Sequence, residues 1–468
     1  MKGMWRAAAA KSRSLARFVG GLIARFAGSR FAFHGCVAVL LLAPHLFGSQ
    51  LSPGPYRFGL PRLSSGDEPH YLVYINSLVK DHDLDLGNNY RDVHRGGEDA
   101  GLVWRGGKID HHSIWFLGEQ RVAWFNVYDD KNWDADENGA PVPRRRDDVD
   151  DRYLPQSELP WNVPGLAIFL AALLFPLAKT PYVEPAALLA SGLVTVLATF
   201  FWRRLALGIT ANRRTMNLGL ALAFLGTPAW NYGRSLFAEP YLVCLILGTF
   251  TFALVKPRLV LSGFLLGMAL YIKPFILVVG LPLGIILLWQ RRFGDAARFA
   301  VPVTAWLGML LGTYHLVYGS ALRSPNDWVS GPLFLNALHL LAYPTRGLLT
   351  TAPITIVALA GWPGLLRRER LFAGALGACA VLFVLVAWNR AWAGGFAYSV
   401  RYLVPVLPLL CLGLLKVIEE KLQTRTAQLY FAGAALLSVS VNALAAIQTW
   451  WAFNGHPFIY FLRNTDFG

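Results

Sequence analysis

The sequence predicts an all-α polytopic membrane protein with about eleven transmembrane helices and a long loop after the first one. Hydrophobic residues make up 55% of the 468-residue chain and charged residues only 15%, which is too apolar for an ordinary soluble protein. Apolar runs of about 20 residues recur along the chain, and each can cross roughly 30 Å of hydrocarbon. Basic residues gather in short clusters between these runs, as at the cytoplasmic ends of membrane helices.

The net charge of +15 does not indicate a nucleic-acid partner, because the two signs of charge are separated along the chain. Between Leu51 and Pro160 lie 20 of the 28 acidic residues but only 13 of the 43 basic ones. The other basic residues flank apolar runs, where the positive-inside rule accounts for them. We therefore expect the lipid bilayer, and no nucleic acid, to face these basic clusters.

The N-terminal part of the chain sets the expected orientation. Residues 1–30 are basic and loosely amphipathic, which favours a helix on the anionic cytoplasmic surface of the membrane. Residues 31–47 form the first span and carry the chain outside. A periplasmic loop at residues 48–181 follows. Residues 451–468 form a tail that we expect on the same outer side.

The long loop is predicted to begin with a helix at residues 67–80. Ser64 or Ser65 can cap this helix, and its first turn carries acidic residues, which the helix dipole favours. Pro69 fits an early helical position.

Two later stretches of the loop also carry a structural signal. Residues 104–128 alternate enough between polar and apolar to hold short strands. Residues 160–179 are apolar, but counting them as a span would place the arginines at 203–214 outside. We therefore expect a helix in the outer membrane interface there.

The remaining apolar runs alternate across the membrane within residues 182–450. Spans two to eleven are predicted at residues 183–202, 216–232, 236–255, 259–272, 275–290, 299–318, 347–366, 371–388, 402–417 and 429–450. This alternation brings one set of polar residues to the outer side: Asp67, Glu68, His70, Arg234, Glu239, Lys273, Arg346, Arg390 and Arg401. Charges at membrane depth are costly and usually mark function, so their convergence predicts a site.

The residue types in this set suit the transfer of a sugar from a lipid phosphate to a hydroxyl. A desolvated Asp67 has a raised pKa and can act as the base near neutral pH. The adjacent Glu68 can raise that pKa further, orient the acceptor or support a divalent metal ion. Lys273, Arg346 and Arg401 can hold the phosphate oxygens through charge-assisted contacts.

Further substrate contacts are expected from side chains of the same face. They are His70, Tyr71, Arg234, Glu239, Trp392, Tyr398 and Tyr402. Simpler interpretations stay open, because acidic residues at a helix start are often only a cap. Cations near a membrane boundary often only reach toward water, and aromatic residues there often form an interfacial belt.

No metal site is predicted from spacing. His111 and His112 lack a third ligand beyond Asp110. Residues 134–139 resemble the first half of a calcium loop, but Arg145 stands where a bidentate glutamate is required, so we expect a polar turn. The sequence therefore identifies no certain cofactor, and a divalent metal ion at Glu68 stays an open alternative.

Several stretches, taken in order, resemble motifs of bacterial GT-C fold glycosyltransferases. This group includes protein O-mannosyltransferases and the lipid A aminoarabinose transferase. The stretches are residues 67–71, 164–166, 236–240, 271–274, 346–349 with Pro353, and 392–402 with Pro405 and Pro408. At positions 397, 399 and 400 the motif is expected to have Ser, Gly and Pro, in that order. This chain departs from it and has Ala397, Ser399 and Val400.

The resemblance implies a GT-C type helix bundle, a polyprenyl-phosphate sugar donor, inversion at the anomeric carbon, and Asp67 as the base. We therefore expect a hexosyl- or pentosyltransferase in the bacterial inner membrane. Its active site would face the periplasm, and its acceptor would be a cell-envelope glycan, lipid or protein.

Two alternative functions stay open. A lipid-linked oligosaccharide polymerase or ligase would use a diphosphate donor and rely on arginines and histidine. A non-enzymatic lipid or solute transporter would show two related halves and carboxylates buried in mid-span, and the sequence shows neither.

Overall fold

The computed structural model describes a set of ranges that covers most of the predicted spans. These are residues 30–48, 57–58, 63, 68–90, 111–117, 120–126, 133–135, 141–143, 159–160, 162–178, 180, 182–255, 257–323, 325, 329–394 and 397–447. Asp67, the serines before it, and the predicted N-terminal and C-terminal segments lie outside the described residues.

The first described part of the chain is one apolar helix followed by the elements of the loop. In order they are α2 (Arg30–Leu42), η1 (Ala43–Leu46), β1 (Phe47–Gly48), β2 (Arg57–Phe58), α3 (Glu68–Asn76), the π-helical turn η2 (Ser77–Asp81), β3 (His111–Leu117), β4 (Gln120–Asn126), β5 (Trp133–Ala135), β6 (Pro141–Pro143), β7 (Leu159–Pro160) and α6 (Gly165–Leu174). The strands form three small sheets, β1-β2, β4-β3-β7 and β5-β6, whose neighbours are antiparallel.

The rest of the described chain is a helix bundle. Its elements are α7 (Val183–Leu207), α8 (Arg213–Leu225), α9 (Ala229–Tyr232), α10 (Glu239–Leu254), α11 (Leu259–Ile272), η5 (Pro274–Ile276), α12 (Leu277–Trp289), α13 (Phe293–Tyr318), α14 (Leu333–Ala342), α15 (Leu348–Thr351), α16 (Pro353–Leu359), α17 (Trp362–Arg368), α18 (Phe372–Trp388), η6 (Arg401–Val406), α19 (Leu407–Leu410), α20 (Gly413–Lys416), η7 (Val417–Lys421) and α21 (Arg425–Ile447). Helix α10 packs between α7 and α11, α12 packs against α18, and α16 packs against α21.

Several helices of the described ranges have the properties of membrane spans. Four are long and apolar enough to cross a bilayer: Val183–Leu207, Phe293–Tyr318, Arg401–Lys421 and Arg425–Ile447. Shorter apolar helices accompany them, among them α10, α11, α12 and α18. The chain is therefore a mostly helical membrane protein. The number of spans and the side that each loop faces stay predictions.

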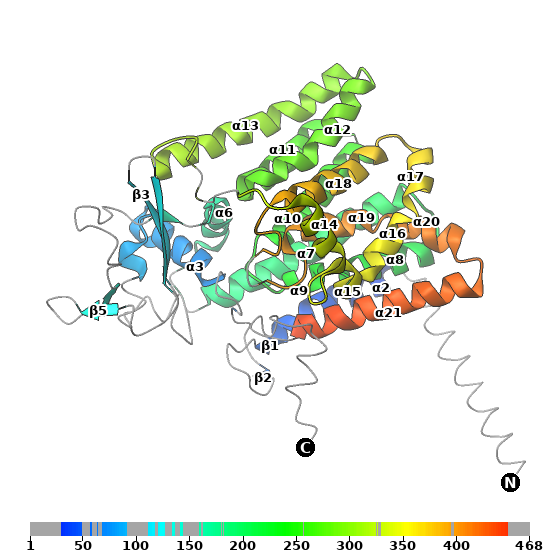
Figure 1. Ribbon diagram of the computed structural model, residues 1–468, viewed down its shortest axis with the longest axis horizontal. Coiled ribbons are helices and arrows are strands. Elements are labelled where there is room, and N and C mark those ends of the chain that lie inside the picture. Colours follow the sequence, from blue (N-terminus) through cyan, green and yellow to red (C-terminus); the bar gives the residue numbers. More distant parts are fainter. Residues whose placement is uncertain are drawn as a thin grey trace, which may run out of the picture.

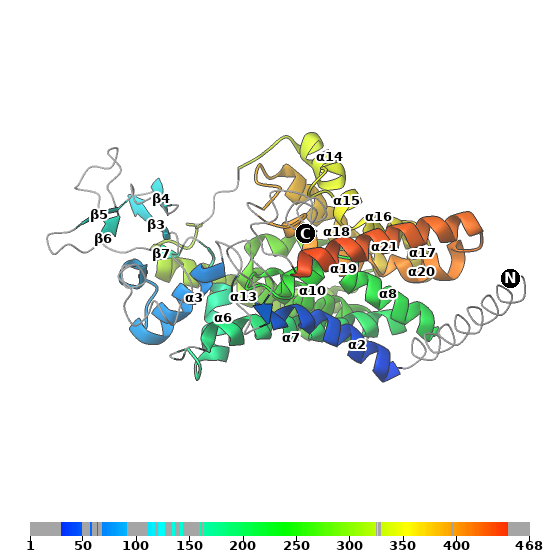
Figure 2. The ribbon, with the colours of Figure 1, turned by 90° about the horizontal axis from the view of Figure 1, so that it is seen from below.

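Two groups of elements lie at opposite ends of the bundle (Figure 1). Helices α3 and α6 and strands β3 and β5 lie at one end, which we call the site end. Helices α17 and α20 lie at the other, and the second view preserves this arrangement (Figure 2). Helix α7 connects the two ends, since its 25 residues extend about 37 Å.

Helix α6 corresponds to the apolar stretch expected to lie in the membrane interface. It has 10 residues, which is too short for roughly 30 Å of hydrocarbon. It packs against α3, α7 and α11. At its start a Cβ on Gly165 would lie 2.1 Å from the backbone oxygen of Tyr271, so only glycine permits this approach.

Three predicted spans are interrupted helices. The run at 216–232 folds as the main part of α8 followed by α9, and the run at 347–366 folds as α15, α16 and the first part of α17. The run at 402–417 lies in η6, α19, α20 and the start of η7. Proline explains the breaks other than the one between α19 and α20, because it has no N–H to donate and disfavours helix in the residue before it.

Indole groups compensate for one of these interrupted segments. Trp202 Nε1 donates to the carbonyl of Pro408 at 2.7 Å, and Trp362 Nε1 donates to that of Leu410 at 2.9 Å. Side-chain donors of this kind let irregular backbone exist at membrane depth where it is buried in protein.

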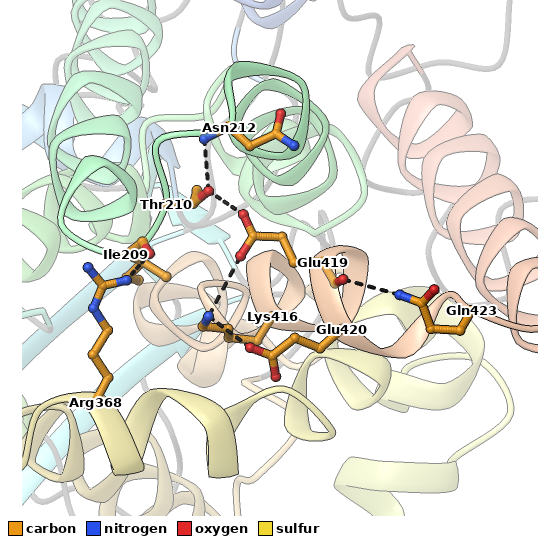
Figure 3. A network of polar contacts seen from close by, with 8 residues as sticks. All are labelled: Ile209, Thr210, Asn212, Arg368, Lys416, Glu419, Glu420 and Gln423. Carbon is orange, nitrogen blue, oxygen red and sulfur yellow. Dashed lines mark hydrogen bonds and ion pairs between the residues drawn. The ribbon is translucent and has the colours of Figure 1, made fainter.

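A polar network joins three basic segments at the end opposite the site end (Figure 3). Arg368 donates to the carbonyl of Ile209, and the hydroxyl of Thr210 donates to Glu419. Lys416 contacts Glu419 at 3.6 Å and Glu420 at 2.9 Å. The clusters at residues 203–214, 367–370 and 416–425 therefore share one end, which we call the basic end.

Candidate active site

Helix α3 places Glu68 against the middle of the chain. The Glu68 side chain is fully buried, and its Oε1 accepts the backbone N–H of Leu236 at 2.6 Å. Glu68 opens α3, where the partial positive charge of the helix start favours a carboxylate. Asp67 directly precedes it in the sequence and lies outside the described residues.

The next two predicted site residues on α3 point into the protein core. His70 is fully buried, and its Nδ1 lies 2.7 Å from the Tyr90 hydroxyl. Tyr71 is 2% exposed and packs edge-on against Tyr74, with ring centroids 6.1 Å apart. These two side chains therefore anchor α3 in the protein core.

The connector between α9 and α10, residues 233–238, is the centre of the site. Besides Leu236 it carries Arg234, which is 6% exposed, and Phe237, which is fully packed. Glu239 follows as the first residue of α10 and is 1% exposed. One short stretch thus holds the partner of Glu68 and a second buried carboxylate.

Arg401 reaches this connector from the C-terminal half of the chain. Its Nε donates to Glu239 Oε1 at 3.0 Å, and both side chains are almost fully buried. Its guanidinium carbon lies 3.9 Å from the centre of the Phe237 ring, a cation–π contact. A nitrogen of the guanidinium also donates to the Gly394 carbonyl at 3.4 Å. The guanidinium of Arg401 is therefore paired with Glu239, and these contacts fix its orientation.

The other two predicted phosphate-binding cations lie around the same segment. Lys273 ends α11 in an extended conformation, and its ammonium lies 5.8 Å from the centre of the Tyr402 ring. The backbone oxygen of Arg346 accepts a contact from the Ser399 hydroxyl at 3.4 Å. Both cations are partly exposed.

The predicted aromatic residues fall into two classes. Trp392 and Tyr402 are partly exposed, and Trp392 stacks against His339 with ring centroids 5.3 Å apart. Tyr398 is buried and donates to Asn442 Oδ1 at 3.1 Å. Of these three rings, those of Trp392 and Tyr402 have exposed surface and that of Tyr398 does not.

Ser399 departs from the sequence pattern at a position of unusual backbone. Its φ is +54°, the left-handed region that glycine adopts at little cost, and the motif it resembles has glycine there. Its hydroxyl lies 2.7 Å from that of Thr351. This hydrogen bond helps to hold the strained conformation.

Sequence reasoning missed three residues that the structure brings to the site. The Tyr232 hydroxyl donates to the Tyr398 carbonyl at 2.8 Å, and the charges of Arg401, Glu239 and Arg346 act on it. Phe237 supports Arg401. Glu184 is buried and binds the backbone of Leu63. A Glu-Pro dipeptide, shared with Glu68 and Glu239, could have identified Glu184.

Metal ligation has no support in the described part of the chain, where no group of three or more His, Cys, Asp or Glu side chains could hold an ion. The side chains of His111, His112 and residues 134–139 lie outside it.

Among the comparisons with known proteins, the one with solved structures gives matches. No protein-family model matches the chain, and no curated protein matches it. Solved structures of ArnT from Cupriavidus metallidurans are similar to it. The one bound to undecaprenyl phosphate has 14% identity and a TM-score of 0.49, covering 90% of this chain and 69% of that chain. The apo form has 15% identity and a TM-score of 0.49, covering 90% and 68%. ArnT is a GT-C aminoarabinose transferase, from the group that the sequence motifs resemble.

Proposed function

We propose that the protein is an inverting glycosyltransferase that moves a sugar from a polyprenyl-phosphate donor to a hydroxyl acceptor. The observation that carries this proposal is a continuous set of buried contacts. Glu68 binds the connector at Leu236, and Glu239 at the end of that connector binds Arg401. These contacts link an acidic segment to a cationic segment, 333 residues apart between Glu68 and Arg401, and they support the proposal that the two segments form one site.

The proposed reaction uses Asp67 as the base. The acceptor oxygen attacks the anomeric carbon, and Asp67 takes the proton from that hydroxyl. The bond between the anomeric carbon and the phosphate oxygen breaks, and the lipid phosphate leaves with the electron pair. Attack opposite to the leaving group inverts the anomeric centre. Glu68 is proposed to orient the acceptor, while its bond to Leu236 N holds the start of α3 against the connector.

Three cations are proposed to stabilise the leaving phosphate. Lys273 and Arg346 are partly exposed and can contact phosphate oxygens directly. Arg401 adds a third charge whose direction Glu239 fixes. Charges that are already oriented need no reorganisation as negative charge develops, which is the main source of electrostatic catalysis.

The remaining substrate contacts are assigned by exposure. Trp392 and Tyr402 are proposed to lie against the sugar or the acceptor. His70, Tyr71 and Tyr398 are proposed to shape the site from beneath, and Arg234 to contribute charge near Glu68. The enzyme would reside in a bacterial inner membrane with this site facing the periplasm, and its acceptor would be a glycan, lipid or protein of the cell envelope.

A donor comparison tests this function. Membranes containing the protein are given one labelled sugar on a polyprenyl monophosphate, a polyprenyl diphosphate or a nucleotide, and label in the acceptor fraction is measured. We expect transfer from the monophosphate alone. Transfer restricted to the diphosphate would indicate a polymerase or ligase, and movement of the intact lipid without bond cleavage would indicate a transporter.

A further inference from the structure

Helix α14 lies between predicted spans seven and eight, in a stretch of the chain where no span is predicted. Its 10 residues extend about 15 Å, which is about half the thickness of the hydrocarbon core, so it cannot cross a membrane. It contains no Asp, Glu, Lys or Arg. It packs against α15 and α18 and lies at the edge of the helix bundle (Figure 2).

The outward side of α14 is apolar. Phe334 is 86% exposed, and Leu333, Leu335 and Leu338 are between 46% and 52% exposed. A helix that faces water on its outward side carries polar residues there, whereas a helix that faces lipid carries apolar ones. The pattern on α14 is therefore that of a helix in contact with lipid.

The inward side of α14 is fixed to the end of α18 by one buried amide. Asn336 is 4% exposed, and its Nδ2 donates to the carbonyls of Ala387 and Asn389, each at 3.0 Å. The last carbonyls of a helix find no donor within that helix, and Asn336 supplies one. Helix α14 is therefore held at the end of an apolar helix.

The chain just before α14 strengthens this attachment. The N–H of Gly331 donates to the carbonyl of Trp388 at 2.8 Å, and the N–H of Arg390 donates to the carbonyl of Val329 at 2.8 Å. Trp388 and Val384, one turn apart on α18, are both more than half exposed. The exposed apolar side of α18 therefore leads to the place where α14 is attached.

The other end of α14 leads directly to a cation of the candidate site. The carbonyl of Tyr343 accepts the backbone N–H groups of Arg346 and Gly347 at 3.2 Å and 2.7 Å. A Cβ on Gly347 would lie 2.5 Å from Tyr343 N, so this turn leaves no room for a side chain there. The depth of α14 in a membrane therefore determines the depth of the Arg346 backbone.

We propose that α14 lies along the membrane interface, with Phe334 and Leu338 among the lipid chains, and that it thereby holds Arg346 at the depth of the lipid phosphates. The partner is the bilayer, because the apolar side of α14 continues that of α18 and carries no charge. Apolar side chains at the boundary between headgroups and chains bind a helix in the plane of the membrane. The role of Arg346 rests on the proposed function, whereas the lipid contact of α14 does not.

The lipid contact is tested by the collision of a nitroxide with oxygen, which concentrates in hydrocarbon, and with a nickel chelate, which stays in water. The label is attached at Phe334→Cys after the exposed Cys36 is replaced by serine, since the other cysteines are buried. The protein is placed in phosphatidylcholine liposomes that contain no polyprenyl lipid. Val384→Cys on α18 is the lipid control, and Gln423→Cys, at an exposed position of the basic end, is the water control.

We expect the label at position 334 to collide more often with oxygen than with the nickel chelate, as at position 384 and in contrast to position 423. More frequent collision with the nickel chelate would show that α14 faces water and would overturn the proposal. Rare collision with both reagents would show that protein covers α14, for example a second copy of the chain, and would also overturn it.

Donor kinetics test the consequence for Arg346. Phe334→Asp should raise the KM for a long-chain polyprenyl-phosphate donor in liposomes, by no more than the about tenfold expected for the loss of Arg346. The matched control, Phe334→Leu, should leave this KM unchanged. A short-chain donor dissolved in water should show the parent KM with both variants, because its phosphate is not fixed at one depth.

Thermal unfolding in detergent separates this role from a structural one. The Phe334 side chain is mostly exposed, so neither variant should lower the unfolding midpoint. An unchanged KM for the long-chain donor in Phe334→Asp, or an equal rise for both donors with a loss of stability, would overturn the link between α14 and Arg346. Absence of transfer from every donor in the parent would reject the proposed function, and the collision measurement would still decide the lipid contact.

Discussion

The two ends of the bundle hold ion pairs of nearly the same length in different surroundings. At the site end, Arg401 and Glu239 are 3.0 Å apart with side chains 6% and 1% exposed. At the basic end, Lys416 and Glu420 are 2.9 Å apart with side chains 15% and 47% exposed. The two distances are nearly equal, but the burial of the two pairs differs. Water screens the charges of the exposed pair. Each charge of the buried pair depends on its partner, because water does not reach it.

This difference indicates what each end does. The network of Figure 3 joins backbone and side chains of three basic segments, so it ties helix ends together. The contacts at the site end hold charges out of water and fix their directions. Such an arrangement is costly for folding and is typical of sites that bind or transform charged ligands.

The largest expected effect is on the buried pair. Glu239→Ala leaves Arg401 buried without its carboxylate and should lower the free energy of unfolding by about 3–5 kcal/mol. Glu420→Ala at the basic end should cause no resolvable change. Denaturant unfolding of the purified protein in detergent measures both, and equal destabilisation would contradict the distinction between the two ends.

A double variant sharpens this prediction. Replacing both members of the buried pair, by Glu239→Leu with Arg401→Met, should recover most of the lost stability, because no charge is then left buried and unpaired. Sugar transfer should be absent in this double variant. Recovery of both stability and transfer would show that the pair has no part in the reaction.

The next effect concerns the partly exposed cations. Lys273→Ala and Arg346→Ala should each raise the donor KM about tenfold, because each removes a charge-assisted contact to phosphate. Stability should change little in either variant. Arg213→Ala, an exposed arginine of the basic end, is the control and should leave the KM unchanged. Donor titration of the transfer rate measures all three.

The smallest effect is expected at Ser399. Ser399→Ala loses the hydroxyl contacts to Thr351 and Arg346 and keeps the left-handed backbone, so it should cost about 1 kcal/mol. Ser399→Gly loses the same contacts but relieves a strain of about 1 kcal/mol, and should be nearly neutral. Thermal unfolding midpoints compare the two, and a glycine variant as unstable as the alanine variant would argue against strain.

Sequence patterns predicted the bounds of a helix well where hydropathy alone determines those bounds. The predicted bounds of the run at 259–272 are those of α11, and α18 differs by one residue from its predicted start. Glu239 and Arg401 were both selected from the sequence because a charged residue next to an apolar run is costly to bury without a partner. Their contact with each other was not predicted.

Other features could not be read from the sequence. The bond between Glu68 and Leu236 joins residues far apart along the chain, and the N–H involved belongs to the backbone, so no side-chain pattern signals it. The run at 402–417 is apolar up to Lys416, and the indole donors of Trp202 and Trp362 show how the carbonyls of Pro408 and Leu410 in it are satisfied. Hydropathy likewise cannot tell that His70 and Tyr398 point into the core.

The central claim is that chemistry takes place at the site end with Asp67 as the base. The most direct measurement is the rate of sugar transfer from a labelled polyprenyl-phosphate pool in membranes that contain the parent or Asp67→Asn at matched amounts. Glu420→Gln at the basic end serves as the control. The account predicts that transfer collapses in Asp67→Asn, with donor binding retained, and persists in Glu420→Gln. Undiminished transfer by Asp67→Asn would contradict it, leaving the acidic pair as a helix cap.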